Sequence, residues 1–184
     1  LSAATPAAGA TIGLVADPDP TRQQQLVRGA ELALALEPRG PRLAIGQPAD
    51  HWGGATAGIE ELIDARGADV LVAPADSRTA HLVAQIATRR HIPAIATAAR
   101  GPLATTGSWW LVTCEWGERD AARVARLLGR APTEWETAGF SAALAARMLL
   151  DAPSGSWSSP GSDWRDRLPD SCQEGEVSDD EHDG

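Results

Sequence analysis

Residues 68–97 read ADVLVAPADSRTAHLVAQIATRRHIPAIAT, and this stretch predicts a strand, a helix and a second strand in that order. The apolar runs at 68–73 and 92–97 are too short for helices, and they are continuous where a strand with one exposed face would alternate. Between them, Asp76 or Ser77 can cap a helix whose apolar positions recur at helical spacing: Leu82, Val83, Ile86 and Ala87. A helical crossover of this length joins parallel strands.

The same unit is repeated earlier in the chain. Apolar runs at 11–16 and 42–46 predict two more strands, and amphipathic stretches ending near Glu37 and covering about 55–65 predict the helices that follow them. We expect an α/β fold of three layers, in which an open, mostly parallel sheet carries helices on both faces. Such sheets bind ligands at the carboxyl ends of their strands, in this chain after Ala16, Gly46, Ala73 and Thr97.

The later part of the chain predicts a fifth strand at 109–114 and amphipathic helices at 118–128 and 133–150. Both helices are expected to bury an apolar side, which includes Val124, Leu127 and Leu128 in the first helix and Phe140, Leu144, Met148 and Leu149 in the second. In the helix that follows the first strand, Arg22, Gln24, Arg28 and Glu31 are expected to face solvent.

Composition divides the chain into three parts. Residues 1–10 are a lead-in of small residues that suits the region just after a removed export signal, although a simple boundary would look the same. Residues 11–151 form the α/β lobe. Residues 152–184 are rich in Ser, Gly, Pro and acidic residues and are expected to be a disordered tail, docking at most through Trp157 and Trp164.

Charge and composition exclude several classes of function. The net charge is -9, but residues 170–184 hold seven acidic residues and no Arg, so about -2 remains for everything before them. The sequence predicts no basic patch, which disfavours a nucleic-acid partner. It contains no Lys, which excludes Schiff-base chemistry and a Walker phosphate loop. No apolar stretch reaches the roughly 20 residues of a membrane-spanning helix.

No catalytic or metal-binding constellation is apparent in the sequence. Ser141 lies in a helical run and not in a nucleophile elbow. The four histidines have no ligand spacing, so no metal and no cofactor is expected: His51, His81, His91 and His182. Cys114 and Cys172 could form a disulfide or remain two separate thiols.

The order and spacing of several segments resemble type I periplasmic solute-binding proteins, nearest to the receptors of ABC transporters for branched-chain amino acids. The resemblance covers about residues 10–106 and is carried by Ile12–Val15, Arg28–Ala33, Glu61–Pro74 and His91–Thr97. A later match at Pro132–Leu149 resembles the helix with which that family returns to its first lobe. The resemblance implies the first lobe of a two-lobed clamshell, without the ~100 or more residues that a second lobe needs.

The resemblance also implies where a solute would bind. The family's contacts from this lobe come from the loops after the third and fourth strands, which carry Ser77, Thr79, Thr97 and Ala98. Arg100 stands where relatives that bind amino acids tend to have a small hydroxyl residue, and it could pair with a carboxylate or fill the site. Trp52 could stack on a solute or cover the end of the sheet. The helix start at Asp76 is either an anion site or an ordinary cap.

Two hypotheses of different classes follow from these features. The first is a noncatalytic, periplasmic or otherwise exported solute-binding protein for an amino acid or a small carboxylate. The second is an interaction or scaffold subunit, in which Trp109, Trp110 and Trp116 contact another protein; the alternative role of these tryptophans is to seal the lobe. An enzyme of flavodoxin-like or Rossmann architecture ranks third, because a fold alone does not establish chemistry and the phosphate-binding loops are missing.

Overall fold

Five parallel strands form one sheet in the computed structural model, which describes residues 9–47, 54–97, 111–114 and 117–151. The strands lie in the order β2-β1-β3-β4-β5, and their bounds are β1 Thr11–Leu14, β2 Arg42–Ile45, β3 Val70–Ala73, β4 Ala94–Thr97 and β5 Leu111–Cys114. The helices are α1 Pro20–Ala35, α2 Gly54–Asp64, α3 Ser77–Arg90, α4 Glu118–Leu128 and α5 Glu134–Leu150. The predicted open parallel sheet is confirmed, and each described strand pair is parallel.

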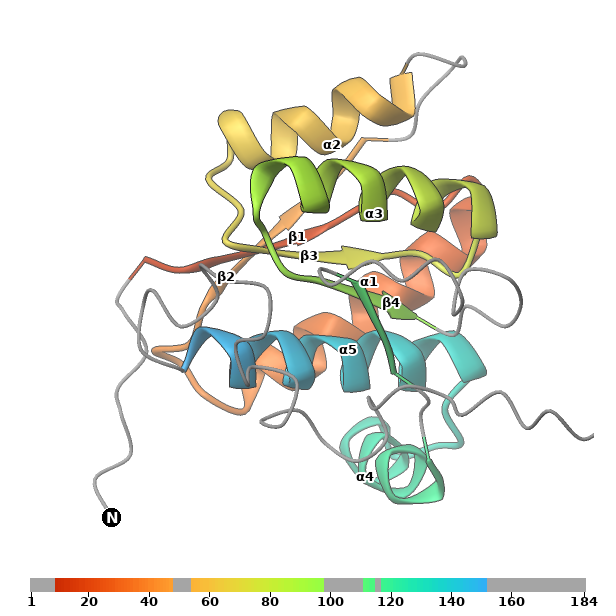
Figure 1. Cartoon of the computed structure of the whole chain (residues 1–184). Coiled ribbons are helices and arrows are strands. Elements are labelled where there is room, and N and C mark those ends of the chain that lie inside the picture. Colours follow the sequence, from red (N-terminus) through yellow and green to blue (C-terminus); the bar gives the residue numbers. More distant parts are fainter. Residues whose placement is uncertain (1–8, 48–53, 98–110, 115–116, 152–184) are drawn as a thin grey trace, which may run out of the picture.

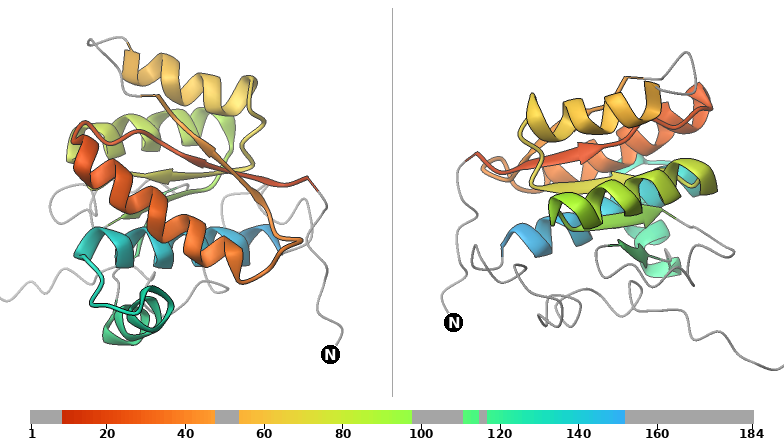
Figure 2. Two further views of the ribbon diagram at one scale, coloured as in Figure 1. Left: turned by 180° about the vertical axis from the view of Figure 1, so that it is seen from behind. Right: turned by 45° about the horizontal axis from the view of Figure 1, so that its top comes forward.

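Helices cover both faces of the sheet, as predicted (Figures 1 and 2). Alternate residues of the central strands point to opposite faces: Ile12, Leu14, Val70, Val72 and Ile95 pack with α1 and α5. Leu71, Ala73, Ala94 and Ala96 pack with α2 and α3. Because both sides of these strands are buried, their sequences are continuously apolar. The short helix α4 lies outside this arrangement, against the outer side of α5 (Figure 1).

The helix starts follow the sequence signals. Asp19 caps α1 by accepting hydrogen bonds from the backbone N–H groups of Thr21 and Arg22, and Pro20 occupies the first turn. Thr133 and Glu136 form a capping box at the start of α5. Gly129 ends α4 with a φ of 67°, a left-handed conformation that glycine adopts without steric cost. These signals explain why the predicted bounds of the helices are close to the observed ones.

Two predicted core residues are exposed. Leu127 and Met148 are 43% and 41% accessible, although periodicity places them on the apolar sides of α4 and α5. Helix α4 buries only Val124 completely, and it covers only part of the outer side of α5 (Figure 1). The predictions for Leu127 and Met148 are wrong because helical periodicity identifies an apolar side without showing how much of it a neighbour covers.

Helices α1 and α5 approach each other so closely that only glycine fits at two positions. A Cβ atom added to Gly139 would collide with the carbonyl oxygen of Leu26, and one added to Gly29 would collide with the carbonyl oxygen of Glu136. The colliding atoms are backbone in both cases, so a rotamer change cannot relieve the contact. This crossing brings the far end of the described chain onto the first helix.

We predict that Gly139→Ala destabilises the protein by about 1–3 kcal/mol, because the two helix backbones must separate. Gly58→Ala is the matched control, since a Cβ there lies 3.6 Å from its nearest neighbour and alanine favours helix over glycine by about 0.5–1 kcal/mol. Urea unfolding of both variants measures the difference. Equal stabilities would contradict the close contact.

The same crossing buries a carboxylate. Glu136 is 2% exposed, and its two oxygens accept hydrogen bonds from the Arg130 guanidinium at 2.9 and 2.5 Å. The backbone N–H of Thr133 donates to it at 2.8 Å. Arg130 is the main reason that the pKa of Glu136 lies below its ordinary value, and the N–H of Thr133 and the charge of Arg28 lower it further.

A carboxyl whose pKa is lower in the folded than in the unfolded state stabilises the fold above its unfolded pKa of about 4.3, and this stabilisation disappears as the pH falls through the folded value. We therefore predict that Glu136→Gln reduces the loss of unfolding free energy between about pH 5 and pH 3. Glu134→Gln, at an exposed carboxyl in the same helical turn, should leave that loss unchanged. Urea unfolding along a pH series tests this, and parallel curves for Glu136→Gln and the unsubstituted protein would refute it.

Candidate functional site

Two of the candidate binding residues, Thr79 and Thr97, lie at the carboxyl edge of the sheet. Because all five strands are parallel, α1 and α3, which follow β1 and β3, begin at this edge. Helix α5 also begins there, on the right of Figure 1. The strand order reverses between β1 and β3: the chain moves from β1 to β2 on one side and returns to β3 on the other. In open α/β sheets such a switch point forms the crevice in which ligands bind.

Thr79 lies in the first turn of α3 and is 9% exposed. Its backbone N–H and its Oγ1 hydroxyl both donate to Oδ2 of Asp76, at 2.8 and 2.7 Å. Asp76 is therefore a helix cap, and its own carboxylate already sits at the helix N-terminus where a bound anion would lie. An anion at this helix start would have to compete with that carboxylate.

Thr97 ends β4 and is 1% exposed. Its Oγ1 donates to the carbonyl oxygen of Ala73 at 3.0 Å, which joins the carboxyl ends of β3 and β4. In both Thr79 and Thr97 the hydroxyl proton is thus used inside the protein. Each hydroxyl oxygen retains lone pairs and can accept a hydrogen bond from a ligand.

Sequence reasoning missed a buried polar group after β1. The Asp17 side chain is fully buried, and its Oδ1 accepts hydrogen bonds from the N–H of Asp19 at 2.8 Å and from Nε of Arg22 at 3.1 Å. The backbone N–H of Asp17 donates to Oε1 of Gln23 at 2.7 Å. An acidic residue directly after a buried strand, followed by an Arg in the next helix, is the signal that could have indicated this cluster.

The sequence predicted that Arg22 faces solvent, but in the structure its guanidinium contacts two other side chains. Its guanidinium lies 2.9 Å from Asp17 and 5.6 Å from the ring centre of Trp135 at the start of α5. The hydrogen bond with Asp17 is the main reason that the pKa of Arg22 is raised, and the charges of Asp19 and Asp76 raise it further. One guanidinium therefore lies in the field of carboxylates that start two different helices.

Two buried polar atoms of this cluster have no hydrogen-bond partner among the described residues. They are Oδ2 of Asp17, an acceptor, and Nε2 of Gln23, a donor. Unpaired buried polar atoms cost about 1–3 kcal/mol each. At the rim between β1 and α1, Asp17 can therefore accept a further hydrogen bond and Gln23 can donate one.

The described part of the rim is suited to hydrogen bonding. It contains the hydroxyl oxygens of Thr79 and Thr97, the carboxylate of Asp17 and the guanidinium of Arg22. The described residues contain no group of three or more His, Cys, Asp and Glu side chains that could hold a metal ion. Ser141 donates to Asp120 at 2.6 Å, but this pair joins α5 to α4 and lies away from the rim.

Several predicted residues cannot be placed. The side chain of Ser77 lies outside the described part, although its backbone begins α3. Entirely outside the described residues are Trp52, Ala98, Arg100, Trp109, Trp110, Trp116 and Cys172, together with most of the lead-in and the whole of 152–184. Of the predicted binding side chains, the structure thus brings Thr79 and Thr97 to the same edge of the sheet.

Solved structures of solute-binding proteins share this fold. No protein-family model and no curated protein matches the sequence. The leucine-binding protein LivK from Thermotoga maritima superposes with a TM-score of 0.50 at 16% identity, over 67% of this chain and 38% of that one. A solute-binding protein from R. palustris in complex with 4-hydroxybenzoate gives 0.49 at 15% identity, over 76% and 44%. The branched-chain amino acid protein LivJ from Streptococcus pneumoniae gives 0.47 at 16%, over 66% and 39%.

The chain therefore has the fold of one lobe of a type I periplasmic solute-binding protein, as the sequence resemblance implied. It spans less than half the length of these structures. None of the described helices combines the length and the hydropathy that a bilayer span requires.

We predict that Asp17→Asn lowers the free energy of unfolding by about 1–2 kcal/mol, because it removes the charge that Arg22 faces in a buried setting. Asp64→Asn is the matched control: Asp64 also pairs with an arginine, Arg90, but both side chains are about half exposed, so the loss should stay below about 1 kcal/mol. Urea unfolding at neutral pH compares the two. Equal losses would mean that burial does not strengthen the Asp17 pair.

Proposed function

We propose that the chain is a noncatalytic solute-binding domain, periplasmic or otherwise exported, that recognises an amino acid or a small carboxylate at the carboxyl edge of its sheet. The main support is the switch point between β1 and β3, where the rim carries polar side chains from α1, α3, β4 and the connection that follows β1. The fold shared with a leucine-binding protein agrees with this proposal.

The hydrogen-bond directions indicate which residues would bind the ammonium group of an amino acid and which would bind its carboxylate. Thr79 and Thr97 use their protons internally, so they would accept hydrogen bonds from the ammonium group of an amino acid. We assign the carboxylate to Ser77 and Arg100, since a hydroxyl can donate to it and a guanidinium can form two parallel hydrogen bonds with it. Ala98 and Trp52 would supply apolar contact to the rest of the solute.

One lobe contacts a solute from one side only. A clamshell gains affinity by closing and burying its ligand on two sides. We therefore expect weak binding by this chain, with a Kd on the order of 1 mM, which corresponds to about -4 kcal/mol. A partner that supplies the opposite wall would tighten it.

Titration with leucine and with two analogues, each of which lacks one of its charged groups, tests the proposal. We predict that leucine shifts the amide NMR signals of the rim more strongly than 4-methylpentanoate, which lacks the ammonium group, or isoamylamine, which lacks the carboxylate. Thr97→Val should weaken leucine binding at least about twofold, because it removes an accepting oxygen worth roughly 0.5–1.5 kcal/mol. Thr88→Val is the matched control, since Thr88 bonds the carbonyl oxygen of Ala84 within the later turns of α3. No shift with any of the three compounds would refute the proposal.

A scaffold role is the alternative. It is supported by the exposed Leu127 and Met148 on the α4 side of the lobe, because apolar side chains there offer contact to another protein. Trp109, Trp110 and Trp116 would extend that contact. A negative titration together with a stably co-purifying protein would favour this role.

A further inference from the structure

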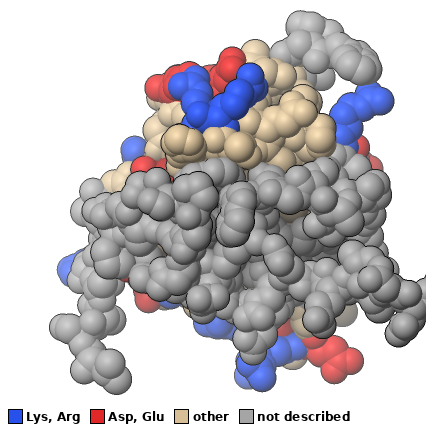
Figure 3. Space-filling model, in the orientation of Figure 1, with Lys and Arg blue, Asp and Glu red and all other residues tan. Residues whose placement is uncertain are grey.

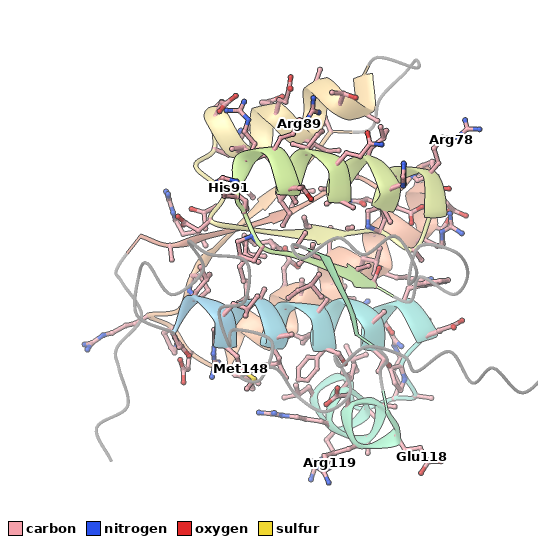
Figure 4. The ribbon with its side chains drawn as sticks, viewed as in Figure 1. Arg78, Arg89, His91, Glu118, Arg119 and Met148 are labelled. Atoms are coloured by element: carbon pink, nitrogen blue, oxygen red, sulfur yellow. The ribbon has the colours of Figure 1, made fainter. Side chains whose placement is uncertain are left out.

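The exposed side of α4 is rich in arginine. Arg119, Arg123 and Arg126 are all exposed on this helix, and Leu127 lies among them. Arg130 follows directly after the helix and is also exposed. Figure 4 shows Arg119 pointing away from the rest of the molecule, at the end of the lobe opposite to α2 and α3. The charge balance of the whole chain, on which the sequence analysis relied, does not show this local grouping of arginines.

Two of these arginines have partners on α5: Arg130 pairs with Glu136, and the Arg123 guanidinium lies 5.5 Å from the ring centre of Phe140. Among the described residues, none forms an ion pair with Arg119 or Arg126. Asp120 is turned towards α5, where it accepts a hydrogen bond from Ser141 at 2.6 Å. Glu118 is the exposed acidic residue that remains on α4.

The opposite face of the lobe is balanced. Arg66 pairs with Glu61 at 3.3 Å and Arg90 pairs with Asp64 at 2.7 Å. Acidic and basic side chains accordingly lie together over α2 and α3 at the top of Figure 3. Arg119 and Arg126 of α4 therefore differ from Arg66 and Arg90, which have acidic partners.

The chain itself contains a complementary segment. Residues 170–184 carry seven acidic side chains and no arginine. The segment is joined to the end of α5 by about 20 residues, and a chain of that length can reach at most about 65 Å. That exceeds the length of α5, which is 17 residues long and rises about 1.5 Å per residue. The segment can therefore reach α4, which packs on α5.

We propose that the acidic segment 170–184 binds, within the same molecule, to the arginine side of α4. The overall charge of -9 repels a separate polyanion such as nucleic acid. A tethered segment is present at an effective concentration in the millimolar range, so it outcompetes weak partners in solution. Exposed ion pairs contribute at most about 1 kcal/mol each. The docking is accordingly reversible and weakens with salt.

The absence of lysine makes a direct test possible. A carbodiimide joins an amine to a carboxylate only where the two are in contact, and this chain has no side-chain amine of its own. Arg119→Lys in the full chain places one amine on α4 and keeps the charge. Arg89→Lys is the matched control, on exposed surface of α3 at the opposite side of the lobe (Figure 4).

We predict that Arg119→Lys gives a monomeric product in which position 119 is linked to the 170–184 segment. Its yield, measured by mass spectrometry of peptides, should exceed that of Arg89→Lys at least about fivefold at low salt, and it should fall sharply in about 0.5 M NaCl. Equal yields at the two positions would overturn the proposal. So would linkage found only in covalent dimers, which would make a second copy the occupant. Circular dichroism confirms that both variants are folded.

Discussion

The contact between α1 and α5 at Gly29 and Gly139 determines how this lobe is closed. Two helices whose contacting glycines are 110 positions apart in sequence (139 − 29) cover one face of the sheet together, and their backbones touch where any side chain would hold them apart. The same contact brings the first turn of α5 beside the first turn of α1, so that Trp135 lies against Arg22. The first turn of α5, which lies far along the chain, is thus part of the carboxyl edge of the sheet.

The helix starts at this edge carry their own carboxylates. Asp19 caps α1, Asp76 caps α3, and Glu136 lies in the first turn of α5. Each compensates the positive end of its helix dipole, which makes the edge less favourable for a bound anion than its geometry alone suggests. The threonine hydroxyls reinforce this, since they donate inwards and can only accept from a ligand. The described residues therefore favour a ligand that brings a positive or donating group.

The sequence predicts the strands and the helix bounds because these depend on local patterns. Continuous apolar runs specify strands buried on both faces, and Asp, Thr, Gly and Pro mark the helix ends. The failures concern contacts between elements. Periodicity cannot show that α4 leaves Leu127 and Met148 exposed, or that Arg22 turns back to a carboxylate after β1. For the candidate site, order along the chain places Thr79 and Thr97 at one edge, but their hydrogen-bond directions depend on Asp76 and Ala73.

The two proposed surfaces are separate, and their physics differs. The solute edge is lined by buried hydrogen bonds, which salt affects little, whereas the arginine side of α4 faces solvent and is screened over about 8 Å at physiological ionic strength. Salt therefore weakens binding to the arginine side of α4 and has little effect on solute binding at the carboxyl edge. Leu127 and Met148 modify this expectation, because apolar contact beside the arginines is insensitive to screening. If Trp157 or Trp164 covers those side chains, part of the docking would persist at high salt, and that remainder would measure the apolar contribution.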